Sequence, residues 1–282
     1  MNLFNSGLYI VSTPIGNLND ISLRSLEILK SSDIILCEDT RRSLKLLNYY
    51  KIKKKLISYH KFNEQSVISK IIEHLNQGKI LSLISDAGTP TISDPGLILI
   101  KECIKKNIKI FSVPGASSIT ASMSVSGFED KFLFYGFLPK TEKELIKVIN
   151  SIKDINFSIV FFIPGKKINF YLKFFKKYLF ERKIFIAREI TKIHETYYRD
   201  DVSKIKPFKG ALKGELTVVV SKKFNIKNES FVDKDIKKEA ASFLKKYSLK
   251  DVVELLFESE KINKKKIYQI CLNIKKIDEK NN

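Results

Sequence analysis

The chain has 282 residues, 44% of them hydrophobic, which is enough apolar surface for one large or two medium folded domains. No run approaches the roughly 18 uninterrupted apolar residues of a membrane helix, and residues 1–6 lack the basic and apolar regions of a signal peptide. A cytoplasmic protein without a membrane partner is therefore expected. The net charge of +20 is compatible with a polyanionic partner.

The source of this charge leaves two interpretations open. Only six of the 51 basic residues are arginine, and lysine, isoleucine and asparagine are frequent throughout the chain. The excess of positive charge either forms a surface that binds RNA or consists of lysines that have accumulated on a solvated surface. Cys37, Cys103 and Cys271 are scattered and share no metal-ligand spacing with the three histidines, so reduced structural thiols and no metal are expected.

The first 115 residues alternate between apolar runs and helical stretches. This alternation predicts an N-terminal α/β domain over residues 1–115 with a mostly parallel sheet. The predicted strands are 8–12, 34–37, 56–58, 80–85 and 108–113, and the predicted helices are 22–31, 40–50, 63–77 and 94–106.

The second half differs because its last strands follow one another without a helix between them. This order predicts some antiparallel pairing, and therefore a mixed α/β domain over residues 116–225. The predicted strands are 132–137, 155–163, 184–188, 196–199 and 216–221, with helices at 119–125, 142–153 and 166–179. Residues 222–234 are polar and predict a linker, and 235–282 predict a small helical appendage with helices at 235–246, 249–258 and 263–275.

Three strands of the first domain open into turns that leave backbone donors bare. They are Thr13 to Leu18, Ser85 to Gly96 and Pro114 to Ser118. In the second turn we expect Asp94 to cap the following helix, with Pro95 at its first position. Such turns at one edge of a sheet predict a ligand cleft, although any α/β fold also uses Gly and Pro for its turns. Neither a GxxxxGK[ST] nor a GxGxxG loop is present, which disfavours ordinary nucleotide hydrolysis and the usual dinucleotide fold.

Several segments in this order are typical of one family. They are GLYIVSTPIGNLNDISLRSLEIL, CEDTRRS, HKFNE, SLISDAGTPTISDPG, SVPGASSITASMSVSG, YGFLPK, AREITKIHETYYRD and KGELTVVVS. With these segments the chain resembles the cytidine 2′-O-methyltransferases of small-subunit (16S) ribosomal RNA, a branch of the tetrapyrrole-methylase-like superfamily. The resemblance covers roughly residues 7 to 275.

The resemblance implies a fold, a reaction and partners. The fold is the two-domain tetrapyrrole-methylase-like α/β fold with the helical appendage described above. The reaction is methyl transfer from S-adenosylmethionine to the 2′-hydroxyl of a cytidine. The implied partners are small-subunit ribosomal RNA, free or within the 30S subunit, rather than DNA, and a second copy of the chain in a homodimer.

The resemblance also implies which residues contact S-adenosylmethionine. The implied cofactor contacts are Pro14, Ile84, Ser85, Asp86, Thr89, Ser117, Ser118, Ile163 and Ile190. For Ile163 and Ile190, simple core packing is an equally good interpretation. Asp86 is different, because a carboxylate directly after a buried strand needs a partner, from a ligand or from nearby amides.

The reaction needs alignment of the reactants and removal of a proton from a weakly acidic hydroxyl, for which a carboxylate is suited. The loop carboxylates that could serve are Glu38, Asp39, Glu64, Asp94 and Glu189; each can instead be a helix cap or a surface ion pair, and the cap is the favoured interpretation for Asp94. The catalytic candidates are Glu38 and Asp39, with Glu64 as the fallback. Arg41 can hold a phosphate with two hydrogen bonds. The substrate-binding candidates are Arg41, Asn63, Lys264, Lys265 and Lys266.

One stretch departs from the family pattern. Residues 163–167 read Ile-Pro-Gly-Lys-Lys, where relatives carry an acid, a histidine and an arginine. The difference removes titratable groups and planar recognition of phosphate. This difference keeps one rival function open, a non-catalytic protein that binds the ribosome or assists its assembly. A second rival, from within the superfamily, is a methyltransferase for a small molecule of the tetrapyrrole type.

Overall fold

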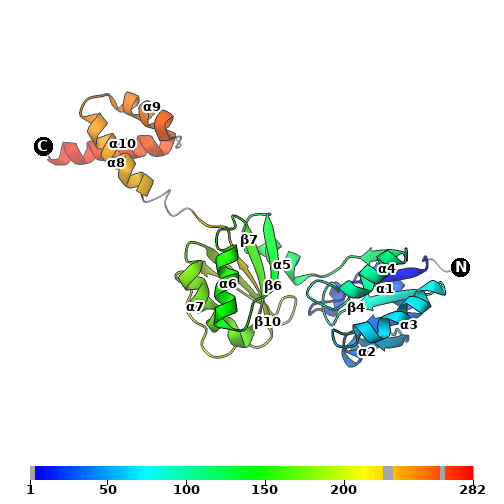
Figure 1. Ribbon diagram of the computed structural model, residues 1–282. Helices are drawn as coiled ribbons and strands as arrows, with labels where there is room; N and C mark the ends of the chain where they lie inside the picture. The colour runs from blue at the N-terminus through cyan, green and yellow to red at the C-terminus, as the bar shows by residue number, and fades with distance from the viewer. Residues whose placement is uncertain (1–3, 225–230, 261–263, 282) are drawn as a thin grey trace. The chain divides into compact units, whose positions relative to one another are not determined.

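The computed structural model describes residues 4–224, 231–260 and 264–281. The chain divides into two compact units, one ending at Lys223 and one from Phe224 onward, and each is described here by itself (Figure 1). No helix in the described residues is both long and apolar enough to span a bilayer.

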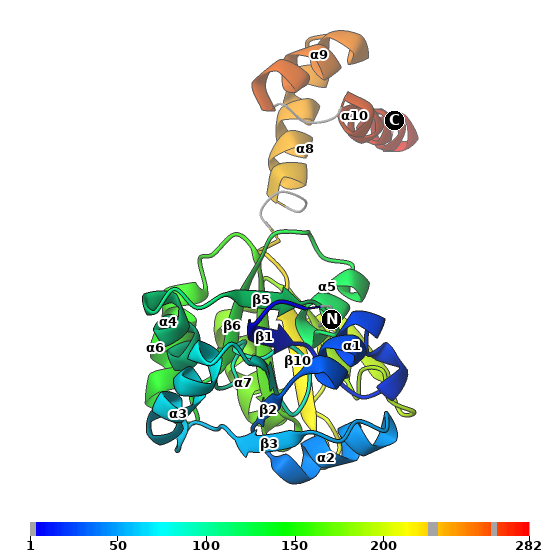
Figure 2. The ribbon, with the colours of Figure 1, turned by 90° about the vertical axis from the view of Figure 1, so that its right-hand side faces the viewer.

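A five-stranded parallel sheet forms the first half of the larger unit (Figure 2). Its strands are β1 (Gly7–Val11), β2 (Ile34–Cys37), β3 (Lys55–Ser58), β4 (Ile80–Ile84) and β5 (Ile110–Val113), in the order β3-β2-β4-β1-β5. The helices are α1 (Leu23–Ser31), α2 (Thr40–Tyr49), α3 (Glu64–Asn76) and α4 (Leu97–Lys105), and a short 3-10 helix, η1 (Leu18–Asp20), follows β1. The predicted parallel α/β architecture is confirmed.

The apolar runs of this sheet are continuous because helices cover both of its faces. Leu8 and Ile10 of β1 pack on the face covered by α3 and α4, whereas Tyr9 and Val11 pack on the face covered by α1 and α2. This alternation follows from the period of two along a strand. The carboxyl ends of the strands are left for the loops that form the site.

The second half of this unit holds a mixed sheet. Its strands are β6 (Phe132–Phe137), β7 (Ser158–Pro164), β8 (Lys183–Arg188), β9 (Thr196–Asp201) and β10 (Glu215–Val220), in the order β6-β7-β10-β8-β9. Only the β6–β7 pair is parallel. The helices are α5 (Ser118–Ser126), α6 (Glu142–Ile152) and α7 (Ile168–Tyr178), with a short 3-10 helix, η2 (Gly165–Lys167), before α7. The predicted mixed sheet is confirmed.

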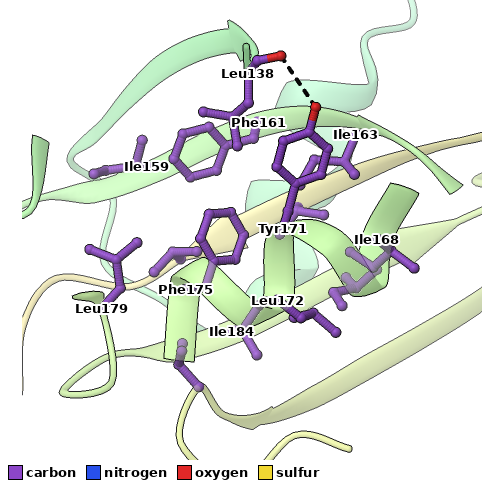
Figure 3. Packing of buried hydrophobic residues seen from close by; sticks show 14 of the residues in the cluster. Leu138, Ile159, Phe161, Ile163, Ile168, Tyr171, Leu172, Phe175, Leu179 and Ile184 are labelled. Atoms are coloured by element: carbon purple, nitrogen blue, oxygen red, sulfur yellow. Dashed lines mark hydrogen bonds between the residues drawn. The ribbon is translucent and has the colours of Figure 1, made fainter. Parts of the chain in front are cut away.

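The two faces of the mixed sheet are covered unequally. Helices α6 and α7 cover one face, where Phe161, Tyr171 and Phe175 pack together and the Tyr171 hydroxyl donates to the Leu138 carbonyl at 3.4 Å (Figure 3). Helix α5 packs on the other face. Both sheets belong to one unit, so the boundary predicted near residue 115 stays a prediction.

Three helices form the smaller unit: α8 (Phe231–Leu244), α9 (Leu249–Glu260) and α10 (Lys264–Asn281). Ser248 caps α9 by accepting a hydrogen bond from the Asp251 amide at 3.4 Å, and Val252, Leu256 and Ile267 are in its core. Residues 231–234 were predicted to be part of the linker, but they are helical: α8 begins at Phe231, four residues before the predicted start at 235. Residues 225–230 of the predicted linker lie outside the described residues.

A buried arginine fixes the end of the mixed sheet. Arg182 is 2% exposed and its guanidinium donates to the carbonyls of Lys153 at 2.7 Å, Ile155 at 2.6 Å, Phe157 at 3.3 Å and Ser221 at 2.7 Å. Burial lowers the pKa of Arg182 from its ordinary value. One side chain thus ties the α6–β7 connection to the end of β10.

Replacing Arg182 with Met is expected to lower the free energy of unfolding by about 2–4 kcal/mol, because four carbonyl oxygens lose a donor. Arg182→Lys should recover only part of this, since a single ammonium cannot reach all four. Urea unfolding followed by circular dichroism measures both. The control is Arg24→Met at an exposed position of α1. Equal losses for Arg182→Met and this control would contradict the assignment.

Candidate functional site

The three predicted turns meet in one structure beyond the carboxyl ends of β1, β4 and β5. Thr13 and Gly88 exchange two backbone hydrogen bonds, of 2.9 and 3.0 Å, so the first turn pairs with the second like a short piece of sheet. The Ser12 and Thr89 hydroxyls lie 2.9 Å apart, and Thr89 also donates to the carbonyl of Ala116 in the third turn at 3.4 Å. Hydrogen bonds within the protein therefore join all three loops.

The segment after β8 closes the site from the mixed-sheet half. The Asn17 amide donates to the Thr191 hydroxyl at 3.0 Å. A Cβ at Gly16 would lie 2.6 Å from Cγ of Lys192, so only glycine permits this close approach. The two halves of the unit thus contact each other at the loop that follows β1.

Backbone strain is concentrated around the site. Six non-glycine residues in the described part of the chain have positive φ angles, and four of them, Thr91, Ser93, Glu189 and Thr191, lie in the two loops that face each other here. Such conformations are unfavourable for L-residues and are retained where surrounding structure holds them. Residues of both loops line the same cleft.

A cleft of about 540 Å³ lies between the loops and the mixed sheet. Its apolar walls include Ile15, Ile119, Phe137, Phe162 and Ile190. Its polar groups include Thr89, Ser93, Asp94, Ser117, Ser118, Glu189, Glu215 and Thr217. A second hollow of about 330 Å³ adjoins it and shares Ile15, Arg42 and Ala87 with it.

Carboxylates gather at the first-sheet side of the cleft. Asp86 accepts a hydrogen bond from the Asp39 amide at 3.3 Å and forms an ion pair with Arg42 at 2.9 Å. The partner that a carboxylate needs at this position is thus found in the protein itself. Burial, and next the charge of Asp86, raise the pKa of Glu38.

Asp94 is not the helix cap that the sequence predicted. Helix α4 begins at Leu97 with Gly96 as its N-cap, because the positive φ angles of Thr91 and Ser93 turn the chain before the helix can start. Asp94 instead lines the cleft. Burial, and next the charge of Glu38, raise its pKa to about 6.

The structure places most of the predicted cofactor contacts on the two hollows. Thr89, Ser117, Ser118 and Ile190 line the larger one, and Pro14, Ser85 and Asp86 line the smaller one. Ile84 and Ile163 are in the core, exposed by 1% and 0%, and line neither hollow. For all nine residues, contact with S-adenosylmethionine stays a prediction.

The predicted catalytic carboxylates have different surroundings. Asp39 caps α2 by accepting from the Arg41 amide at 2.9 Å, and it forms an ion pair with the Arg41 side chain. Hydrogen bonds from Arg41 lower the pKa of Asp39 to about 2, which makes it a weak proton acceptor. Glu64 accepts a hydrogen bond from Tyr59 at 3.1 Å and lines neither hollow.

The predicted substrate-binding residues are spread over the chain. The Asn63 side chain holds its own turn by accepting from the His60 amide and donating to the Ser58 carbonyl, and Arg41 is exposed next to Asp39. Lys264 forms an ion pair with Glu254 at 2.8 Å within the helical unit. Lys265 and Lys266 begin α10, but their side chains lie outside the described residues.

Sequence reasoning missed Arg42, Glu215 and Thr217. Arg42 was detectable from the helical period, because it lies on the same face of α2 as Leu46. Glu215 and Thr217 alternate along β10 and so face one side, yet no motif marks them as ligand contacts. Lys192 reaches the cleft only because the segment after β8 folds back toward Gly16.

The stretch that departs from the family pattern does not line the cleft. Within the described residues, 163–167 contribute to neither hollow. Gly165 donates to the Gly214 carbonyl at 2.8 Å, and a Cβ there would lie 2.5 Å from the Leu212 carbonyl oxygen. The position of Gly165 is therefore fixed by its contacts with the 212–214 segment.

Comparison with known proteins places the chain in a family. The sequence profile of the tetrapyrrole (corrin/porphyrin) methylases matches residues 7–206. The ribosomal RNA small subunit methyltransferase I of Mesomycoplasma conjunctivae is 48% identical over 76% of this chain and 90% of its own length. The protein of the same name from Rickettsia prowazekii is 38% identical over 95% of this chain and 97% of its own length.

Solved structures share the fold at low sequence identity. Diphthine synthase superposes with a TM-score of 0.61 at 15% identity, over 76% of this chain and 89% of that one. Uroporphyrin-III C-methyltransferase from Thermus thermophilus, complexed with S-adenyl homocysteine, gives 0.53 at 13%, over 76% of this chain and 96% of that one. The fold and the resemblance stated from the sequence are confirmed: the chain belongs to the ribosomal RNA small subunit methyltransferase I family, within the tetrapyrrole methylase superfamily.

Proposed function

We propose that this protein transfers a methyl group from S-adenosylmethionine to the ribose 2′-hydroxyl of a cytidine in small-subunit ribosomal RNA. The observation that carries the proposal is the extent of the match to the family. The match to the Rickettsia protein covers 95% of this chain, whereas the general methylase profile ends at residue 206. A small-molecule methyltransferase that shared only the fold would give no reason for the additional match.

The cleft fits S-adenosylmethionine in size and chemistry. Its volume of about 540 Å³ lies within the range of about 300–1,000 Å³ that is usual for small-molecule sites. Phe137 and Phe162 offer apolar walls for the adenine ring, and Asp94 and Glu215 offer negative charge to a cationic ligand. When bound, S-adenosylmethionine supplies a methyl group that its sulfonium charge has already activated. The protein then has to orient the hydroxyl and accept its proton.

Asp94 is the carboxylate best suited to accept this proton. It lines the cleft, and its pKa of about 6 is close to working pH, where a proton acceptor is most effective. Glu38 supports it, because the charge of Glu38 raises the pKa of Asp94. Asp39, whose pKa is about 2, positions α2 and Arg41 instead.

The non-catalytic alternative rested on the altered 163–167 stretch. Because this stretch lines neither hollow, its change leaves the cleft intact. A protein that only bound the ribosome would have no need for a cleft with strained loops and a carboxylate of raised pKa. The homodimer implied by the resemblance stays a prediction, which sedimentation velocity tests.

The direct test is methyl transfer to unmodified small ribosomal subunits. The wild-type protein with labelled S-adenosylmethionine is expected to place one 2′-O-methyl group on a cytidine, which mass spectrometry of nuclease digests locates. Uroporphyrinogen III serves as the competing small-molecule acceptor. Methylation of that acceptor but not of subunit RNA, or binding to subunits without transfer, would contradict the proposed function.

Gly88→Val is expected to weaken S-adenosylmethionine binding by about tenfold or more, as titration calorimetry would measure. Gly88 has φ of +83°, and a Cβ there would lie 3.3 Å from Ile15 in the wall of the cleft. A β-branched residue is strained in this conformation and would shift the loop. The matched control is Gly78→Val, because Gly78 has φ of +77° with open space around it. Equal affinity in the two variants would contradict the role of the loop.

Activity is expected to rise with pH through an apparent pKa of about 6, because Asp94 must be ionised to accept a proton. Asp94→Asn should abolish this limb and lower kcat by about a hundredfold or more. The pH profiles of kcat and of kcat/KM for subunit RNA measure the loss of the acid limb and the fall in kcat. The control is Asp130→Asn at an exposed position.

Stability separates this effect from misfolding. The pKa of Asp94 is raised in the folded protein, so the folded state holds the proton more tightly than the unfolded state, and stability falls as pH rises from about 4 to about 6. Asp94→Asn lacks this loss and should unfold at higher urea concentration than wild type at pH 7.5. An unchanged acid limb in Asp94→Asn would refute the assignment of the proton acceptor.

A further inference from the structure

Helix α2 presents a basic and aromatic face to the hollow beside the cleft. Arg42, Lys45, Leu46 and Tyr49 lie at positions i, i+3, i+4 and i+7, and all four line the hollow of about 330 Å³. Leu47 is buried in the core of the first sheet and anchors the other side of the helix. The face that lines the hollow is therefore held in place by a rigid element.

The segment that contains α2 carries unbalanced charge. Residues 40–55 hold seven basic residues and no acidic one, although the chain as a whole has 31 acidic residues against 51 basic ones. The seven are Arg41, Arg42, Lys45, Lys51, Lys53, Lys54 and Lys55. The two arginines pair with Asp39 and Asp86, but the five lysines form no ion pair with the described part of the chain. This local charge favours a polyanion beyond what the general lysine excess explains.

Tyr49 offers an aromatic ring at the end of this face. Its side chain is 58% exposed, and the ring meets Tyr50 edge-on with centroids 4.9 Å apart. The Tyr50 hydroxyl donates a hydrogen bond to the Leu18 carbonyl, which fixes Tyr50 and thereby braces Tyr49. An exposed, braced ring is suited to stack on a nucleic acid base.

A third hollow adjoins the hollow along α2. It measures about 560 Å³ and shares Gly16, Leu18 and Tyr49 with the hollow along α2. Its opposite wall is the 191–194 segment, in which Ile193 is 97% exposed. The hollow along α2 and this third hollow, lined between them by α2, residues 16–19 and residues 191–194, are called the α2 groove.

We propose that the α2 groove binds a single-stranded segment of the RNA substrate next to the target nucleotide, with a base stacked on Tyr49 and a phosphate held by Lys45. The inference rests on the proposed function. The segment is single-stranded because only an unstacked base exposes its face to an aromatic side chain. The groove opens into the cleft that holds Asp94, so a strand bound there can deliver one nucleotide to the reacting groups.

The helical unit offers less for the same ligand. Its Lys264 is paired with Glu254 at 2.8 Å and lies 4.8 Å from the Phe257 ring centroid, so this charge is already engaged. Within the described part of the chain, Lys45 forms no such ion pair. Its charge is therefore available to a phosphate in the α2 groove.

The test measures binding and turnover with two probes, unmodified small-subunit RNA transcribed in vitro and unmodified small subunits. Tyr49→Ala is expected to raise KM for RNA about tenfold because the stacking interaction is removed, while Tyr49→Phe retains the wild-type value. The variant Lys45→Gln should reduce the slope of log affinity against log salt by about 0.7, because one phosphate is no longer neutralised. Affinity for S-adenosylmethionine should not change in any of them.

Matched controls come from the mixed-sheet half of the chain. Lys143→Gln removes one exposed charge from α6, and Phe180→Ala removes an aromatic side chain that is 50% exposed. Both should behave as wild type toward RNA.

Three outcomes decide the proposal. A KM for Tyr49→Ala no higher than that for Phe180→Ala, with an unchanged salt slope in Lys45→Gln, would overturn it. Weaker binding to intact subunits but not to the free RNA would also overturn it, in favour of an interaction with a ribosomal protein. If wild type transfers no methyl group, the proposed function fails, and the RNA affinities of these variants still decide whether the groove binds RNA.

Discussion

Two backbone hydrogen bonds between Thr13 and Gly88 hold together the site on which the rest of this protein's chemistry depends. They join the turns after β1 and β4, strands that are neighbours in the sheet, and the Ser12 and Thr89 hydroxyls extend the link toward the third turn. Because backbone groups make the bond, it fixes the loops without using the side chains that face the cleft. Asp86, Asp94 and the serines of the third turn take their positions from this frame.

The charges of the molecule are separated by sign around this frame. Acidic groups, Glu38, Asp86 and Asp94, gather at the carboxyl edge of the first sheet, where burial and their mutual repulsion raise the pKa of two of them. Basic groups occupy α2 and the segment that follows it. Arg42 lies at the boundary, because it pairs with Asp86 and lines both the cleft and the neighbouring hollow. Surfaces of opposite charge thus lie on either side of Arg42, and the methyl donor and RNA strand proposed to bind there carry the complementary charges.

Sequence patterns predicted the frame well because they report local physics. Apolar runs bounded by Gly and Pro turns predicted all ten strands, since burial on both faces of a sheet leaves a continuous run. The predicted starts of α1 and α9 lie within one residue of the structure, because Ser22 and Ser248 cap these helices and capping depends on neighbouring residues alone. Asp94 was misread for the same reason: an Asp-Pro pair before a helix normally caps it, and only the strained turn at Thr91 and Ser93 moves the helix start to Leu97.

The sequence by itself determined the family, the order of the elements and the three turns that form the floor of the cleft, because each depends on a contiguous stretch of chain. Tertiary structure alone decided the pKa of each acidic side chain at the site. Asp39 and Asp94 are both loop carboxylates in sequence, yet the Arg41 side chain lowers the pKa of one to about 2, while burial beside Glu38 raises the other to about 6. Tertiary structure also decided which face of α2 lines the groove. The outer part of the groove forms because residues 191–194, distant in sequence, lie against Gly16 and Asn17. Charge, burial and approach over such separations are properties of the packed chain, which no local pattern encodes.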